Sequence, residues 1–481
     1  MNAADAAIAA VLAIPALAAA LLAFLPSYRV GAAINVAAAF LTFLAALTFL
    51  FQRPEVGSYL FIDDLNNVFI TLTTFVGFTA SAFGASYIAH ELKIGRLTPA
   101  NLRFYHAMYQ TLMFALNLAL VANNIGLMWV AVEIATLTTV LMVGIYRTHE
   151  ALEAAWKYFI LGSVGIALAL FGTILVYLAA QPVIGPGFDA MVWTVLVTRA
   201  AAFDAGILNL AFIFLLLGYG TKVGLAPLHA WLPDAHAEGP TPISAVLSGL
   251  LLNVALYALL RFKILLAANP GTVAPSPLMV TMGLVSLVFA GFMLYRRRDI
   301  KRFFAYSSIE HMGIVTFAFG LGGAIANFAG LLQMTMHSLT KSAIFFAVGH
   351  IAQAKGTQRF IQIRGLSVSD PAFAFAFALA VIAIAGLPPF GIFKAEFLLA
   401  TSTFARAPWL AVIFGIGILV AFGALIIRLQ DVLFGKPSPS ERIATATLIP
   451  LYAHLAIVLA AGIYLPEALV RWFEAVAKML G

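Results

Sequence analysis

Apolar runs recur along the whole chain and are separated by short polar stretches. The hydrocarbon core of a bilayer requires roughly 20 mostly apolar residues for each helical span, and these runs have that length. With 63% hydrophobic and only 10% charged residues among 481 positions, the chain cannot be a soluble protein with one core. These features predict an all-α, polytopic membrane protein.

Hydropathy predicts about fourteen transmembrane helices. They lie near residues 3–25, 30–51, 68–90, 105–122, 124–146, 155–180, 206–231, 241–265, 277–295, 303–321, 324–352, 371–399, 408–433 and 448–466. The first run has no basic segment before it, which predicts a retained first span and not a cleaved signal peptide.

Lysine and arginine are concentrated in the loops that follow odd-numbered predicted spans, most densely at Arg296, Arg297, Arg298, Lys301 and Arg302. Because cytoplasmic loops carry the excess of basic residues, this bias predicts an N-terminus on the outer side of a bacterial cytoplasmic membrane. An even number of spans places the C-terminus there too. The net charge of +7 is explained by these loops and does not indicate nucleic-acid binding.

The chain ends in a segment whose apolar residues recur at helical spacing: Leu469, Trp472, Phe473, Val476 and Met479. This pattern predicts a short helix at the membrane interface. The chain has no cysteine, which excludes disulfides, iron–sulfur ligation by this chain and thiol catalysis.

Ionisable residues lie inside the predicted spans: Glu133, Lys157, Lys222, Lys341, Lys394 and Glu396. Each costs about 2.5–3.5 kcal/mol near the bilayer centre, so stability alone does not explain them. Glu133 has a structural alternative, a hydrogen bond to a neighbouring helix. Lys157 is close to the start of its span and can extend to the surface. Lys222 lies well inside its predicted segment, 206–231, which favours a functional role.

Two predicted spans contain helix-breaking residues next to these charges: Gly224 and Pro227 in the seventh, Pro388 and Pro389 in the twelfth. Proline removes a helical donor and frees a carbonyl, which at membrane depth requires protein or water as a partner. Interrupted helices in two halves of a chain are typical of transport folds with inverted repeats.

Burial disfavours the charged form of Lys222, and a nearby carboxylate favours it. A carboxylate that moves would therefore load and discharge the lysine with a proton. We expect Glu133 to be that partner. Translocation at the parent rate in Glu133→Gln would refute the pairing.

Histidines add groups that titrate near neutral pH. His229, His236, His311, His337 and His350 fall in or beside the central spans. His337 and Lys341 are four residues apart and share a helical face. Glu310 and His311 are adjacent, so we expect them to point to different faces, on a route toward one surface. His229 and His236 make a poor metal site because no cysteine or paired carboxylate is near.

The residues so far resemble one family, the antiporter-like proton-translocating subunits of respiratory complex I, cation/proton antiporters and membrane-bound nickel-iron hydrogenases. The segments that carry the resemblance are TKVGLAPLHAWLPDAHAEGPTPISAVLSG, AYSSIEHMG, MHSLTKSAIFF and GLPPFGIFKAEF, together with Glu133. SSIEHMG, LLNVALYALLRF and GLPPFGIFKAEFLL look most like component F of hydrogenase-4 complexes.

The resemblance implies two inverted five-helix repeats, at 104–265 (helices 4–8) and 277–433 (helices 9–13), with broken helices 7 and 12. Residues 1–103 hold the first three helices, and 448–481 hold the last helix and the tail. The family implies a hydrated mid-membrane axis: Glu133, Lys222 and Glu396 match its fifth-, seventh- and twelfth-helix positions, and His337 and Lys341 match its eleventh-helix positions.

The chain departs from the family at Asn253, where many complex I relatives have an eighth-helix lysine. The central link then runs through water and His229 or His236, or the cycle differs. Lys394 beside Glu396 is an addition relative to much of complex I, and an ion pair between the two would keep Glu396 ionised.

The resemblance implies a subunit without its own cofactor or redox centre, driven by electron transfer in peripheral hydrogenase subunits and assembled with other membrane subunits. The alternatives are a Na⁺/H⁺ antiporter subunit, a membrane subunit for inorganic carbon uptake, and a structural anchor. The cost of the buried charges and the two broken helices argue against the anchor.

Overall fold

The computed structural model describes residues 3–437 and 448–481, and in this part of the chain every extended regular element is a helix. The α-helices are α1 (Ala3–Phe24), α2 (Tyr28–Leu47), α3 (Asp64–Lys93), α4 (Pro99–Val121), α5 (Ile125–Val143), α6 (His149–Ile184), α7 (Trp193–Arg199), α8 (Ala205–Val223), α9 (Trp231–Glu238), α10 (Thr241–Val246), α11 (Leu252–Ala267), α12 (Ser276–Leu294), α13 (Ile300–Leu321), α14 (Ala324–Lys355), α15 (Leu366–Ser369), α16 (Pro371–Ile384), α17 (Gly391–Arg406), α18 (Pro408–Leu433), α19 (Ile449–Ile463) and α20 (Glu467–Met479). A π-helix, η5 (Leu247–Leu251), joins α10 to α11.

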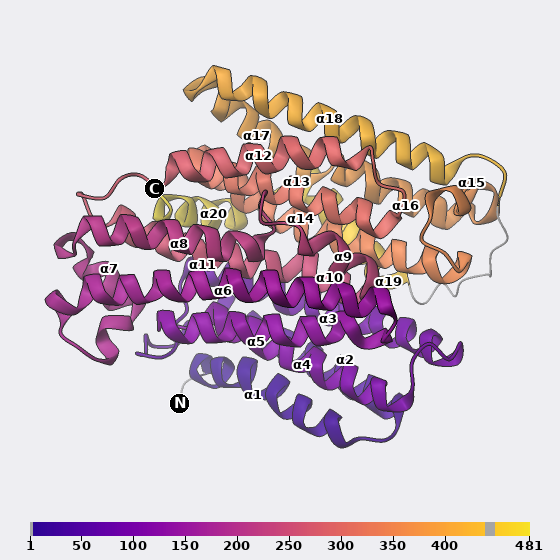
Figure 1. Cartoon of the computed structure of the whole chain (residues 1–481), viewed down its shortest axis with the longest axis horizontal. Helices are drawn as coiled ribbons and strands as arrows, with labels where there is room; N and C mark the ends of the chain where they lie inside the picture. The colour runs from indigo at the N-terminus through magenta and orange to yellow at the C-terminus, as the bar shows by residue number, and fades with distance from the viewer. Residues whose placement is uncertain (1–2, 438–447) are drawn as a thin grey trace.

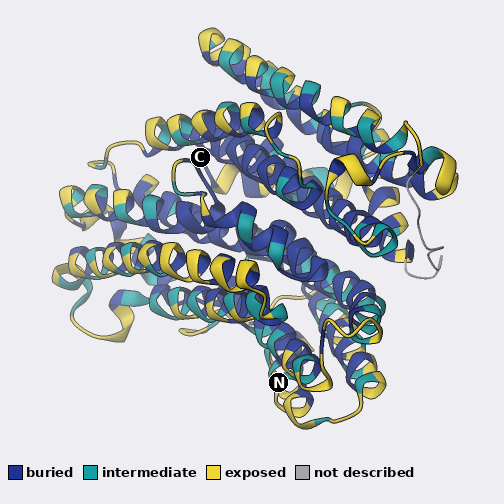
Figure 2. Ribbon diagram, turned by 45° about the vertical axis from the view of Figure 1, so that its right-hand side comes forward, coloured by how far each residue is buried: buried dark blue, intermediate teal, exposed yellow. Residues whose placement is uncertain are grey.

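The long helices run side by side as one bundle, with α1 and α18 at opposite edges and α14 in the middle (Figure 1). α14 contacts α3, α10, α13, α16, α17, α19 and α20, which come from all parts of the chain. Exposed residues gather on the outer helices and buried residues fill the middle (Figure 2). Charged side chains in the centre of the bundle are therefore shielded from the surroundings of the protein.

The predicted spans all coincide with helices, and the predicted fold class is confirmed. By length and composition, nine helices of the described residues could cross a membrane, or eleven if each bent pair forms one span. This number is below the predicted fourteen because α4, α13 and α14 are not among the helices that are apolar enough, and because α16, α17 and α19 are each too short alone.

Several helix starts follow directly from the sequence. The side chains of Thr98, Asn124 and Asp299 precede α4, α5 and α13 and accept hydrogen bonds from free backbone N–H groups of the first turn. Glycines allow close helix packing: Gly283 of α12 and Gly313 of α13 face each other, with a built Cβ on Gly313 2.7 Å from the Gly283 carbonyl oxygen.

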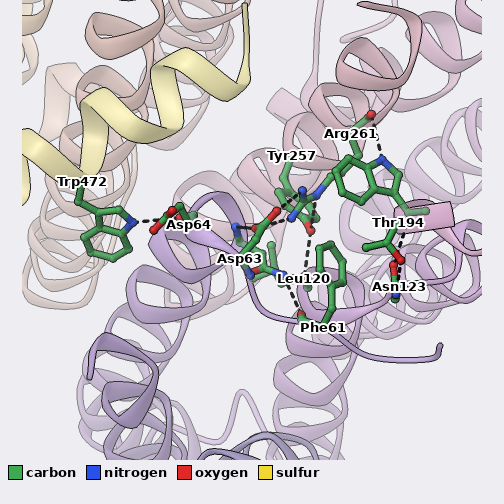
Figure 3. A network of polar contacts seen from close by, with 11 residues as sticks. Phe61, Asp63, Asp64, Leu120, Asn123, Thr194, Tyr257, Arg261 and Trp472 are labelled. Carbon is green, nitrogen blue, oxygen red and sulfur yellow. Dashed lines mark hydrogen bonds and ion pairs between the residues drawn. The ribbon is translucent and has the colours of Figure 1, made fainter. Parts of the chain in front are cut away.

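A buried ion pair joins the start of α3 to α11 (Figure 3). Arg261 is 1% exposed, and its two terminal nitrogens donate to the carboxylate of Asp63 at 2.6 and 2.7 Å. The guanidinium also lies 4.4 Å from the ring centroid of Trp193, and its Nε donates to the hydroxyl of Tyr257 at 2.8 Å. Bidentate geometry and aromatic contacts make this a strong link between distant segments.

The predicted C-terminal helix is α20, which meets α19 at 83°. Phe473 and Val476 are buried, and the indole nitrogen of Trp472 donates to the carbonyl of Asp64 at 3.1 Å (Figure 3). The carbonyl of Leu480 accepts from Lys263 at 2.6 Å. These two hydrogen bonds hold the tail against α3 and α11.

Candidate functional site

Lys222 is the last polar residue of α8 and is fully buried. The helix ends immediately after it, because Gly224 adopts a left-handed conformation with φ +80° and Pro227 lies in the turn that leads to α9. The Nζ of Lys222 has no hydrogen-bond partner among the described residues and lies 5.4 Å from the ring centroid of Tyr158. The predicted break and the buried lysine therefore occur together.

Glu133 lies on α5 and is half-buried. Its Oε2 has no hydrogen-bond partner in the described structure. The carboxylate and Lys222 are close enough to interact electrostatically, although no ion pair within 4.0 Å joins them in this conformation. Val130, Leu137 and Leu141, on the same side of α5, are exposed. Glu133 therefore connects the interior beside Lys222 with an outward-facing apolar surface.

A second polar cluster joins α13, α14 and α17. The Nε2 of Gln333 lies 3.0 Å from Nδ1 of His311 and donates to Oε1 of Glu396 at 3.1 Å. The other ring nitrogen of His311 lies 3.3 Å from Oε2 of Glu310. All four side chains are buried. Glu310 and His311 were expected on different faces of α13; both are buried inside the bundle, and their side chains approach each other to 3.3 Å.

α14 extends this cluster along one face, with Gln333, His337 and Lys341 at intervals of four residues. The rings of His311 and His337 are 5.5 Å apart, and neither nitrogen of His337 has a hydrogen-bond partner in the described chain. The Nζ of Lys341 donates to the carbonyl of Phe304 at 3.0 Å. The shared face that the spacing predicts is present and buried.

The second break separates α16 from α17, with Pro388 and Pro389 between them. Glu396 reaches back to it, since a Cβ built on Gly386 would lie 2.1 Å from Oε2 of Glu396. No ion pair joins Lys394 to Glu396 in the described structure, so the condition under which Lys394 would keep Glu396 ionised is not met here. The two residues are two positions apart on α17, so their side chains point to different sides of the helix. Lys394 donates instead to the carbonyl of Ala461 at 3.1 Å.

Asn253 follows the π-helix η5 and joins α11 to α14. Its amide donates to the hydroxyl of Ser338 and, at 3.2 Å, to the carbonyl of Gly249. Its Oδ1 has no described partner. Asn253 thus stands next to the His337 face in the position where the resemblance expects a lysine.

His236 is fully buried in α9 and stacks on Phe345 at 4.9 Å, and neither ring nitrogen has a described hydrogen-bond partner. Phe345 belongs to α14, which also carries His337 and Lys341. His229 lies in the turn before α9 and is 8% exposed, with its ring 4.8 Å from that of Phe289. His236 is therefore the better placed of the two histidines to adjoin the central groups.

Lys157 is not part of these clusters. Its side chain is 49% exposed and forms ion pairs with Glu153 at 2.6 Å and Asp234 at 3.2 Å. Because it lies in the third turn of α6, its side chain reaches the surface, as the alternative interpretation expected.

Buried polar atoms without a described hydrogen-bond partner recur through both clusters, on Glu133, Lys222, His236, Asn253, Glu310, Gln333 and His337. Buried polar groups are normally satisfied, and internal water is the usual partner when protein atoms are not. The arrangement can hold protons at carboxylate, amine and imidazole groups. Among the described residues, no group of three or more His, Asp or Glu side chains could hold a metal ion.

Sequence reasoning missed Gln333 and Arg261. Gln333 precedes His337 and Lys341 by four and eight residues, so the helical spacing that identified the other two also indicates it. Arg261 lies inside the predicted span 241–265 and inside α11, which ends at Ala267, but no sequence pattern pointed to its pairing with Asp63.

Comparison with known proteins defines the class. The chain belongs to the family described as "NADH:quinone oxidoreductase/Mrp antiporter, TM", whose model matches residues 122–422. It is 58% identical over 472 residues to the Hydrogenase-4 component F homolog of Methylacidiphilum infernorum, covering 98% of this chain and 99% of that protein.

Solved structures share the fold. A chain of the archaeal membrane-bound sulfane sulfur reductase superposes with a TM-score of 0.86 at 22% identity, covering 98% of this chain and 97% of that chain. A chain of respiratory complex I from Thermus thermophilus superposes with a TM-score of 0.82 at 22% identity, covering 99% and 100%. The chain is therefore an antiporter-like, multi-pass membrane protein.

Proposed function

We propose that this chain is the proton-translocating membrane subunit of a redox-driven complex, a membrane-bound nickel-iron hydrogenase of the hydrogenase-4 type. The observation that carries the proposal is the series of buried ionisable groups without full sets of partners, placed beside two helix breaks. The similarity to a hydrogenase-4 component F homolog supports the hydrogenase assignment.

Lys222 and Glu133 form the first switch. Two unit charges about 4 Å apart interact by about 4 kcal/mol at an effective dielectric of 20, which is roughly a thousandfold in proton affinity. When the carboxylate approaches, Nζ of Lys222 holds its proton, and when the carboxylate withdraws the proton leaves. Neither Nζ of Lys222 nor Oε2 of Glu133 has a described hydrogen-bond partner, so this conformation corresponds to the separated arrangement.

The second cluster holds protons on His311, His337, Lys341 and Glu396. Gln333 keeps Glu396 close to His311 by binding both groups. A proton on His311 can therefore pass toward Glu396 and the second break, where the helix is interrupted between α16 and α17. Asn253 and the hydroxyl of Ser338 supply polar contacts beside this face without holding charge.

The energy source lies in partner subunits. The proposed complex brings peripheral hydrogenase subunits and further membrane subunits to this chain, and the half-buried Glu133 on an exposed apolar face fits coverage by one of those membrane subunits, because a carboxylate is costly against lipid. We place the chain in the bacterial cytoplasmic membrane, with both termini on the outer side and the repeats at 104–265 and 277–433.

Sodium transport is a second candidate, because the family model includes Mrp antiporters. Proton and sodium transport can be distinguished in vesicles that contain the intact complex, with transport driven by the electron donor of the complex. Proton pumping is followed by a pH-sensitive dye with and without Na⁺, and sodium uptake is followed by the isotope. The proposal expects acidification that does not require Na⁺.

The matched test compares Glu133→Gln with Glu153→Gln. Glu153 is an exposed carboxylate that pairs with Lys157. We expect Glu133→Gln to lose most pumping while electron transfer continues, and Glu153→Gln to pump like the parent. Parent-level pumping by Glu133→Gln in the assembled complex would remove Glu133 from the mechanism.

A further inference from the structure

A polar cavity opens where the ends of α3, α9 and α14 meet the start of α13. It has a volume of about 390 Å³ and is lined by charged and hydrogen-bonding groups, among them Glu91, Arg96, Glu238, Lys301 and Gln353. It belongs to neither of the two clusters described above. All of these helix ends face the side to which the basic loops belong, which is the inner side in the proposed orientation.

Glu91 is the buried acid of this cavity. The residue is 0% exposed, although it lies within three residues of the end of α3. Nε2 of Gln353 donates to Oε1 of Glu91 at 2.8 Å. Nη1 of Arg96 lies 3.1 Å from the other carboxylate oxygen of Glu91, Oε2. The side chain of Arg96 is 52% exposed. One carboxylate oxygen is thus bonded to an amide of α14, while the other faces a half-exposed guanidinium that also lies 4.6 Å from the ring centroid of Tyr146.

Lys301 forms the inner wall of the cavity and is 1% exposed. Its ammonium donates to the carbonyls of Ala237 at 3.1 Å and of Gly239, at the end of α9. Ala237 directly follows His236, so Lys301 is bonded to the backbone next to that buried histidine. His236 in turn stacks on Phe345 of α14, the helix that also carries His337 and Lys341. The cavity wall therefore contacts the segment that leads to the second cluster.

The other titratable or charged groups around Glu91 leave it as the natural acceptor. His90, Tyr87 and Tyr146 also line the cavity. Glu238 pairs with Arg302 at 3.1 Å, and its side chain is 26% exposed. Glu91 differs from it in being fully buried, with a cation beside it that is half-exposed.

We propose that this cavity is the inner-side proton inlet of the chain, with Glu91 as the first buried acceptor and His236 as the next polar group toward Lys341. A hydronium ion in the cavity gives its proton to Oε2 of Glu91 and becomes water, and the Arg96 pair opens. The proton then leaves for a water on the His236 side, and Glu91 and Arg96 pair again. The inlet rests on the proposed function, since it supplies the axis described there.

Accessibility can be tested directly because the chain has no cysteine of its own. Ala352 lines the cavity, and Ala255 is fully buried in α11. In the assembled complex, a charged, membrane-impermeant thiol reagent applied from the inner side should label Ala352→Cys and not Ala255→Cys. Labelling of Ala352→Cys should also slow pumping. Failure to label it, or labelling without any loss of pumping, would contradict the inlet.

The second arm compares Glu91→Gln with Glu467→Gln in the same vesicles. Glu467 is an exposed carboxylate that pairs with Arg471 at 3.3 Å, so it reproduces the arginine contact without burial. We expect Glu91→Gln to lose most pumping and Glu467→Gln to lose none. If Glu91→Gln pumps like the parent while Lys222→Ala does not, the inlet is wrong and the axis stands. If both pump like the parent, the proposed function itself fails.

Discussion

Gly162 of α6 leaves the space that the ammonium of Lys222 occupies: a Cβ built on Gly162 would lie 2.8 Å from Nζ of Lys222. Any side chain at this position must displace the end of the lysine. Because Lys222 is flexible at its tip, the displacement changes the site more than the fold.

We therefore expect Gly162→Ala to assemble normally and to lower coupled proton pumping. The control is Gly415→Ala in α18, where a built Cβ meets nothing within 4 Å. Pumping assays on the two variants, with electron transfer measured in parallel, check this. Equal pumping by both would show that the position of the Lys222 ammonium does not matter.

Gly386→Ala should abolish pumping and reduce thermal stability. Gly386 has φ +68°, and a Cβ there would lie 2.1 Å from the Glu396 carboxylate. A left-handed conformation costs a non-glycine residue roughly 1–2 kcal/mol. Gly322→Ala is the control, since Gly322 has φ +66° but its Cβ would meet only a carbonyl oxygen at 3.4 Å. A similar loss of pumping in both variants would assign the effect to backbone strain and not to Glu396.

Gln333→Leu removes the amide that binds both His311 and Glu396. We expect pumping to fall steeply while the complex still assembles, because the buried carboxylate loses its hydrogen-bond donor at 3.1 Å. Thr335→Val is the comparison, since the hydroxyl of Thr335 bonds only to its own helix, at Leu331. Parent-level pumping by Gln333→Leu would exclude Gln333 from the proton route.

The Asp63–Arg261 pair predicts a stability loss in acid. Burial alone would raise the pKa of Asp63, but the charge and hydrogen bonds of Arg261 lower it below its ordinary value of 3.8. A lowered folded-state pKa gives stability that is complete above the unfolded pKa and disappears as pH falls through the folded pKa. Thermal unfolding of the purified complex should therefore shift downward below about pH 4.

Arg261→Met should remove this pH dependence and cost about 3–5 kcal/mol, because it leaves a carboxylate without its partner. Arg471→Met breaks an exposed pair, with side chains 70% and 77% accessible, and should change stability little. If the two variants unfold alike, the buried pair does not hold α3 to α11.

The sequence predicts the parts of the site that depend on local chemistry. Gly224 and Pro227 end α8, and Pro388 and Pro389 lie between α16 and α17, because these residues disrupt helices wherever they occur. The full burial of Lys222 follows from its distance to either edge of an apolar run.

Relations between helices are less predictable. His311 and Glu396 come from different helices and are joined by Gln333 of a third, and one helix considered alone does not reveal such neighbours. Lys394 turns to the carbonyl of Ala461 on α19, a helix far along the chain. Arg261 remains buried because Asp63 and aromatic rings surround it, and hydropathy does not detect such partners.

The most direct measurement is proton uptake by vesicles that contain the intact complex with Lys222→Ala, driven by the electron donor of the complex. Lys157→Ala is the control, since Lys157 is exposed and paired at the surface. The account predicts that Lys222→Ala transfers electrons but loses coupled proton uptake, while Lys157→Ala keeps it. Coupled uptake at the parent rate in Lys222→Ala would contradict a proton axis through this lysine.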